Sequence, residues 1–238
     1  MYKNRSILGI IPARSGSKGL PGKNIMSLCG KPLISWTIRE ALLSKYLDKV
    51  IVSTDDNKIA LISRKYGADV PFLRPKKLAT SSSKIIDVLI HAINYLENKD
   101  QNYQLIMLLQ PTSPLRKAQD IDGAIELLFK KKAKSIVSVC PSEHHPWWSD
   151  TLTKDERLTN FLKQIDLHKN RQHLPKFYRI NGAIYLVYIE FLKKNKSFFS
   201  KETFAYLMPI ERSVDIDNQL DFEFAKVLAK KIKNVKKH

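Results

Sequence analysis

The stretch ILGIIPARSGSKGLPGKN (residues 7–24) decides which fold we expect. Its apolar half, residues 7–11, has the length and composition of a strand buried in a sheet. Four of the eight glycines in the chain follow between Gly16 and Gly30. Three cations lie within ten residues beside these glycines: Arg14, Lys18 and Lys23. Because glycines let main-chain N–H groups approach an anion closely, this segment predicts a phosphate-binding loop at the carboxyl end of the first strand.

Two common phosphate motifs do not describe this loop. The dinucleotide fingerprint G-x-G-x-x-G is absent. A Walker A motif is nearly present, but Ser17 stands where its first glycine should be. Asn24 replaces the Ser or Thr that would hold Mg²⁺. The loop therefore belongs to a third kind of nucleotide site.

Strand-like and helix-like segments alternate along the rest of the chain. Short apolar runs predict further strands at residues 50–52, 105–109, 136–139 and 183–187. Apolar residues at helical spacing predict helices over residues 33–43, 59–66, 86–93 and 121–129, and a last helix after Asp217. This alternation is typical of an α/β fold with a mostly parallel sheet flanked by helices.

The length of 238 residues suits one domain, which we expect to cover residues 1–238. The alternation stops over residues 141–176, where aromatic, charged and polar residues follow one another without a period. We interpret this segment as an arm or lid inserted into the domain.

Composition excludes several classes of protein. Hydrophobic residues make up 43% of the chain and charged residues 27%, which is ordinary for a globular protein and excludes collagen-like and disordered chains. The two cysteines, Cys29 and Cys140, cannot form a disulfide framework and are typical of a reducing compartment. With no membrane-spanning run and no signal peptide evident, we expect a cytoplasmic protein without a membrane partner.

A net charge of +18 favours anionic partners. One alternative is a basic nucleic-acid-binding protein, which should gather its cations on one recognised module. The lysines are instead scattered along most of the chain, so we expect no nucleic-acid partner.

Six motifs in order resemble those of one enzyme family. The loop IPARSGSKGLPGKN (residues 11–24) is similar to the nucleotide loop of the CMP-sialic acid synthetases, the cytidylyltransferases that activate nonulosonic acids. The other motifs are VSTD (52–55), QPTSPLR (110–116), RQHLP (171–175), NGAIY (181–185) and SVDID (213–217). Together they span most of the chain.

The resemblance implies a Rossmann-like nucleotidyltransferase fold and a defined reaction. Members transfer CMP from CTP to the anomeric hydroxyl of a nine-carbon α-keto acid sugar and release pyrophosphate. The residues that it places on the nucleotide are Ala13, Arg14, Ser15, Gly16, Lys23, Asn24 and Arg74. Those that it places on the sugar acid are Gln110, Thr112, Ser113, Arg171 and Tyr185. Lys23, Arg14 and Asp217 are the catalytic candidates.

Asp215 and Asp217 are candidate ligands for Mg²⁺, for which Mn²⁺ is a possible substitute. In an extended segment, residues two apart lie on one face, which suits a divalent cation. The alternative is that Asp217 simply caps the final helix. With the other motifs present, we favour the metal interpretation, and Asp217 is also a candidate to deprotonate the attacking hydroxyl.

Two departures from the family pattern leave the acceptor open. Thr80 to Ser83 follow Leu78-Ala79, where the family commonly has an acid, and Trp148 stands where sialate enzymes tend to have a lysine. Legionaminic or pseudaminic acid therefore remains an alternative to neuraminic acid. We also expect the arm to be exchanged across a homodimer.

Overall fold

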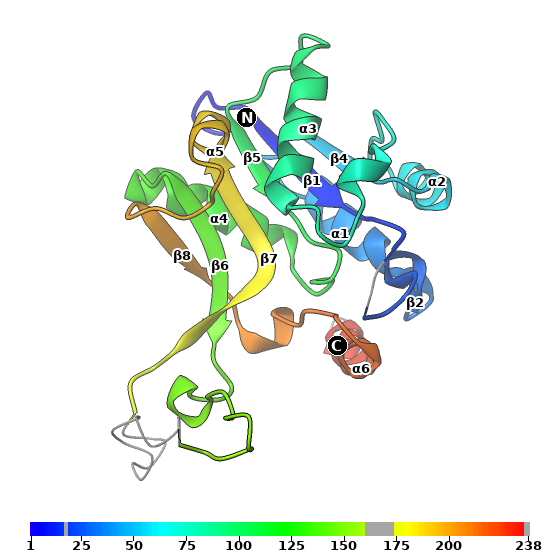
Figure 1. Ribbon diagram of the computed structural model, residues 1–238. Coiled ribbons are helices and arrows are strands. Elements are labelled where there is room, and N and C mark those ends of the chain that lie inside the picture. The colour runs from blue at the N-terminus through cyan, green and yellow to red at the C-terminus, as the bar shows by residue number, and fades with distance from the viewer. Residues whose placement is uncertain (17–18, 160–173, 236–238) are drawn as a thin grey trace.

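The computed structural model describes residues 1–16, 19–159 and 174–235. Within these residues the main sheet has six strands in the order β4-β1-β5-β7-β6-β8 (Figure 1). In that order they are Lys49–Ser53, Ile7–Pro12, Leu105–Leu108, Tyr178–Tyr188, Ser135–Pro141 and Thr203–Leu207. A small hairpin, β2 (Ser27–Leu28) with β3 (Lys31–Pro32), follows the glycine-rich loop.

Helices cover both faces of the sheet. They are α1 (Leu33–Leu42), α2 (Asn57–Lys65), α3 (Ile85–Glu97), α4 (Ala118–Lys131), α5 (Ile189–Asn195) and α6 (Gln219–Val235). Residues of β1 pack on both faces of the sheet. Ile7 and Ile11 join a core with α1, α2 and α4, whereas Leu8 and Ile10 join a core with α3 and α5. Apolar residues of α6 pack on α1 and the hairpin in a third cluster.

The expected mostly parallel α/β architecture is confirmed, with one strand reversed. β1 runs parallel to β4 and β5, and β6 runs parallel to β8. The strand predicted at residues 183–187 is present as part of β7, but β7 runs antiparallel to both β5 and β6, which the sequence did not indicate. An apolar strand buried on both faces has the same pattern in either direction, so its sequence does not reveal the reversal. β8 and α5 were not predicted.

The segment proposed as an arm leaves the sheet between β6 and β7. The pairing of β6 with β7 continues beyond the ends of the other strands, as far as Pro141 opposite Tyr178. Figure 1 shows them extending together away from the body of the sheet. Residues 160–173 lie outside the described part, so the role of this segment stays a prediction. In the part of the chain that is described, no helix combines the length and apolarity needed to cross a bilayer.

Candidate active site

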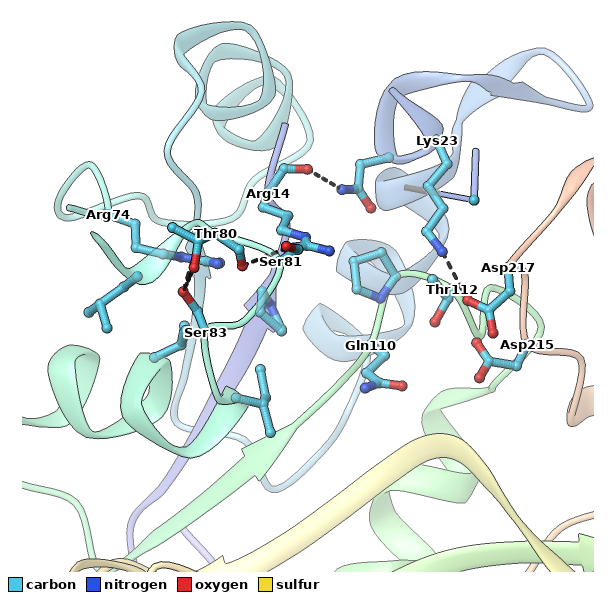
Figure 2. A pocket seen from close by; sticks show the side chains of 17 residues that line it. Arg14, Lys23, Arg74, Thr80, Ser81, Ser83, Gln110, Thr112, Asp215 and Asp217 are labelled. Atoms are coloured by element: carbon cyan, nitrogen blue, oxygen red, sulfur yellow. Dashed lines mark hydrogen bonds and ion pairs between the residues drawn. The ribbon is translucent and has the colours of Figure 1, made fainter. Parts of the chain in front are cut away.

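A cavity of about 620 Å³ opens at the carboxyl ends of β1 and β5. Arg14, Lys23 and Asn24 of the glycine-rich loop line it, as predicted for a ligand site on an open α/β sheet. Figure 2 shows Arg14 and Arg74 toward one end of the cavity, and Lys23 with Asp215 and Asp217 at the other.

The glycine-rich loop is held in shape by side chains on either side of it. Asn24 is buried, and its Nδ2 donates to the carbonyl oxygen of Arg14 at 3.0 Å. Ser15 donates to the carboxylate of Asp55 through its main-chain N at 3.1 Å and its Oγ at 2.7 Å. Asp55 lies in one of the six motifs, but sequence reasoning gave it no role. Its position shows that it fixes the start of the loop.

Three of the predicted nucleotide residues contribute main chain rather than cavity-lining side chains. Ala13 is buried and its N donates to the carbonyl oxygen of Ser53 at 3.0 Å. Gly16 is exposed, and Ser15 faces Asp55. Their place in the loop is compatible with binding phosphate through N–H groups.

Two guanidinium groups form one wall of the cavity. Arg74 is buried and donates from Nε to Ser53 Oγ at 3.1 Å, and from Nη2 to the Ser53 carbonyl oxygen. Burial lowers the pKa of Arg74 to about 10, so it stays charged at neutral pH. Arg14 donates from Nη1 to the carbonyl oxygen of Thr80 at 2.6 Å. The polar segment that replaces the expected acid thus supplies a main-chain acceptor to Arg14.

The opposite end of the cavity joins the first loop to the segment before α6. Lys23 Nζ lies 2.7 Å from the carbonyl oxygen of Ile216 and 3.2 Å from Asp217 Oδ1. Asp215 lies beside them with its Oδ1 buried and without a hydrogen-bond partner among the described residues. Burial raises the pKa of Asp215, against a hydrogen bond from Thr112, and the charge of Asp217 raises it further.

The helix-cap alternative for Asp217 is wrong. Asn218 caps α6, since its Oδ1 accepts from the N of Asp221 at 3.0 Å. The Asp221 carboxylate accepts in return from the N of Asn218 and of Asp217. The Asp217 side chain is 77% exposed and is directed to Lys23, so it is available to a ligand.

Asp215 and Asp217 fit a Mg²⁺ ion that is shared with a nucleotide. Among the residues that the structure describes, no cluster of three or more His, Cys, Asp or Glu side chains is suited to a metal. Mg²⁺ bound with phosphates needs only one or two carboxylates, because phosphate oxygens and waters complete its shell. The unpartnered Oδ1 of Asp215 is the oxygen that such an ion would satisfy.

The predicted sugar-acid residues are not all brought together. Gln110 and Thr112 line the cavity. Ser113 is fully buried and donates from Oγ to the Asn181 carbonyl oxygen at 3.3 Å, so the structure places it away from the cavity. Tyr185 is partly buried against Phe198, and the charge of Asp215 helps to raise its pKa after burial. Arg171 lies outside the described residues.

Gly182 is a site residue that sequence reasoning missed. It has φ +73°, and a Cβ there would lie 2.7 Å from Gln110 Oε1 and 3.1 Å from Asp215 Oδ2. The backbone of β7 therefore passes directly behind both side chains. A glycine inside a strand is the signal that could have shown this close approach.

Comparisons with known proteins identify the family. The cytidylyltransferase family model matches residues 8–236. The chain belongs to the cytidylyltransferase family. It is therefore a nucleotidyltransferase, and the resemblance seen in the six motifs is confirmed.

Relatives with curated names cover almost the whole chain. A CMP-N,N'-diacetyllegionaminic acid synthase from Legionella pneumophila is 39% identical over 93% of this chain and 95% of its own length. A pseudaminic acid cytidylyltransferase from Campylobacter jejuni is 34% identical over 94% and 96%. An N-acylneuraminate cytidylyltransferase from Escherichia coli is 38% identical over 94% of this chain, which spans 52% of that longer protein.

Solved structures support the fold. A CMP:2-keto-3-deoxy-manno-octonic acid synthetase complexed with CTP matches with a TM-score of 0.72. It is 15% identical and the match covers 95% of this cytidylyltransferase and 99% of that chain. At this identity the likeness confirms the Rossmann-like nucleotidyltransferase fold and no more.

Lys23→Ala should lower turnover about 10²–10³-fold, because a positioned cation that stabilises developing phosphate charge has effects of that size. Pyrophosphate release measures it, and circular dichroism should show an unchanged fold. Lys31→Ala, which removes an exposed lysine from the nearby hairpin, is the control. Near-normal turnover in Lys23→Ala would exclude the phosphate role.

Asp217→Asn and Asn218→Ala should separate the metal site from the helix cap. Asp217→Asn should raise the Mg²⁺ concentration needed for half-maximal rate at least several-fold and leave the melting temperature nearly unchanged. Asn218→Ala should instead lower stability by about 1 kcal/mol through loss of the cap. Equal Mg²⁺ titrations for the wild type and Asp217→Asn would remove Asp217 from the metal site.

Gly182→Ala should abolish most activity, since its methyl group would collide with Gln110 and Asp215. Gly30→Ala is the matched control, because Gly30 also has a positive φ, +84°, but nothing lies within 4 Å of its Cβ position. Both variants should lose about 1 kcal/mol from the left-handed backbone. Only Gly182→Ala should lose turnover, and equal activities would contradict the close approach.

Asp215→Asn should stabilise the protein at neutral pH in Mg²⁺-free buffer. A raised pKa means that the ionised carboxylate opposes folding at every pH where the unfolded chain is ionised. The amide removes that cost, so the melting temperature should rise by a few degrees. The gain should fade as pH falls toward the usual aspartate pKa, about 3.9, and disappear below it, where the carboxyl group is protonated in both the folded and the unfolded state. An unchanged melting temperature at neutral pH would contradict the burial argument.

Proposed function

We propose that this cytidylyltransferase transfers CMP from CTP to the anomeric hydroxyl of a nonulosonic acid and releases pyrophosphate. The observation that carries the proposal is the cavity with cations along its walls and two carboxylates at one end. Relatives named for activation of legionaminic, pseudaminic and acylneuraminic acids, at 34–39% identity, support the acceptor class.

The side chains of the cavity suggest a division of tasks. Arg14 and the loop N–H groups bind the triphosphate, and the buried Arg74 contacts the nucleotide. Lys23 exchanges its contact with Asp217 for a phosphate oxygen. Asp215 and Asp217 would hold Mg²⁺, which would neutralise negative charge on the phosphates. The acceptor hydroxyl attacks the α-phosphorus in line with the departing pyrophosphate, and Asp217 accepts its proton.

Gln110 and Thr112 bound the acceptor side of the cavity. We propose that Gln110 contacts the sugar acid and that Thr112 holds Asp215 in place, as its hydrogen bond to that carboxylate supports. The resemblance also assigns Tyr185 and Arg171 to the sugar acid, and we propose that Arg171 binds the substrate carboxylate.

The arm favours a homodimer. Large apolar side chains are exposed along it and along the strand that leads from it, which a second copy would cover: Trp148, Leu152, Leu158, Tyr178 and Ile180. Light scattering after gel filtration should give twice the mass of one chain. We expect the enzyme to act in the cytoplasm, where its cysteines Cys29 and Cys140, which form no disulfide within the described residues, stay reduced.

Pyrophosphate release with CTP and Mg²⁺ tests the proposal when neuraminic, legionaminic and pseudaminic acids are offered separately. We expect release with at least one acid, none without an acid, and strongly reduced release with Lys23→Ala. The acid that supports the highest kcat/KM identifies the acceptor. If none of the three acids supports pyrophosphate release, although the protein is folded and binds CTP, only the CTP-binding part of the proposal would stand.

A further inference from the structure

Arg116 places a guanidinium group inside the protein, behind the acceptor side of the cavity. The side chain is 1% exposed. Its Nη1 donates to the carbonyl oxygen of Ala183 at 2.7 Å and lies 3.4 Å from that of Gln110. Its Nε and Nη2 have no hydrogen-bond partner among the described residues.

In the part of the chain that the structure describes, no carboxylate pairs directly with this guanidinium. Asp120 and Glu40 are near enough to favour its charge, but each is engaged elsewhere. Asp120 holds Arg212 at 2.7 Å, and Glu40 accepts from the N of Ala118 at 3.0 Å. Burial lowers the pKa of Arg116 to about 10, so it is charged at neutral pH. Burying a charge without a direct partner is costly, and an apolar side chain would fill the same space more favourably.

The two carbonyl groups explain what Arg116 does there. The antiparallel pairing of β5 with β7 ends at Leu108 opposite Tyr185. Continuing that register by two residues puts Gln110 opposite Ala183, where the sheet opens toward the cavity. Two carbonyl oxygens cannot bond to one another, and the guanidinium donates to both. The Gln110 carbonyl oxygen also accepts from the N of Ser113 at 3.3 Å and from Thr37 Oγ1 at 3.5 Å, but of these donors only Arg116 also binds Ala183 of β7.

This bridge lies directly behind the acceptor pocket. Gln110 lines the cavity, and Gly182, next to Ala183, lies against the Gln110 and Asp215 side chains. A shift of either carbonyl would therefore move the Gln110 carboxamide relative to Asp215. The Arg14 and Arg74 wall is formed by other segments, and no bond of Arg116 reaches it.

We propose that Arg116 is a positioning residue that fixes Gln110 against β7 and so sets the apparent affinity for the sugar acid, but not for CTP. This inference rests on the proposed function, since it assumes that Gln110 contacts the acceptor.

Arg116→Met and Arg116→Lys test the inference with the acid that the wild type accepts. Arg116→Met should raise KM for the sugar acid about tenfold, because small misplacements of binding groups have large effects, while KM for CTP changes less than about twofold. Arg116→Lys should recover part of the loss, since an ammonium group can donate to both carbonyls. Asp122→Asn is the control: Asp122 is a buried carboxylate of α4 that binds Ser44 and touches neither Gln110 nor Ala183.

A double-mutant cycle keeps the test valid if Arg116→Met fails to fold. If Arg116 acts through Gln110, the effect of Arg116→Lys on the sugar-acid KM should disappear in a Gln110→Ala background. A lower melting temperature with both KM values unchanged, as expected for Asp122→Asn, would make Arg116 merely structural and overturn the inference. A wild type that accepts none of the acids would instead refute the proposed function.

Discussion

The contact of Lys23 with the segment before α6 joins the glycine-rich loop to the acidic end of the site. One ammonium group connects the loop after the first strand to residues almost two hundred positions later in the chain, through Ile216 and Asp217. It places a positive charge beside two carboxylates that repel one another, and one of them, Asp215, is partly buried. Without this cation, the acidic end of the cavity would be electrostatically unfavourable in the absence of ligands.

The same contact is weak enough to be exchanged. Asp217 is largely exposed, and ion pairs of that kind contribute little to stability because water competes for both partners. A triphosphate offers Lys23 a stronger acceptor, while Mg²⁺ offers the carboxylates a stronger cation. In this structure, Lys23 and the carboxylates therefore partly neutralise one another. In the proposed complex, each would exchange that contact for a phosphate oxygen or for Mg²⁺. Gly19 permits this arrangement, since a Cβ there would overlap the main-chain oxygen of Asp217.

Sequence reasoning was most successful where local pattern decides structure. The buried first strand, the glycine-rich loop and the amphipathic helices all follow from residue spacing, and the cavity lies where that loop predicted it. The reversal of β7 was missed because burial on both faces hides strand direction. β8 was missed because it is a short edge strand, with an exposed Phe204 and Leu207 and no alternation of buried and exposed residues.

Within the site, the sequence predicted which residues carry suitable chemical groups better than it predicted which residues lie next to one another. Lys23, Asp215 and Asp217 lie together, as the roles proposed for them require, and the family resemblance had suggested those roles. Whether Asp217 is a cap or a ligand depended on Asn218, one residue away, which the sequence could not distinguish as the better cap. The burial of Ser113 and the close approach of Gly182 depend on how β7 passes the loop after β5, which is a long-range contact.

The two walls of the cavity differ in how they are built, and this difference bears on substrate choice. The nucleotide wall consists of segments that follow the parallel strands β1 and β4, with Arg74 fixed to Ser53 at the end of β4. The proposed acceptor wall contains Gln110 and Thr112, and the antiparallel β7 passes behind it at Gly182. Relatives named for different nonulosonic acids have similar identity to this chain. Since their names describe the same kind of nucleotidyl transfer to different acids, we expect acceptor preference to arise on the Gln110 side of the cavity. There, a buried guanidinium rather than a ladder of main-chain bonds sets the distance between the strands.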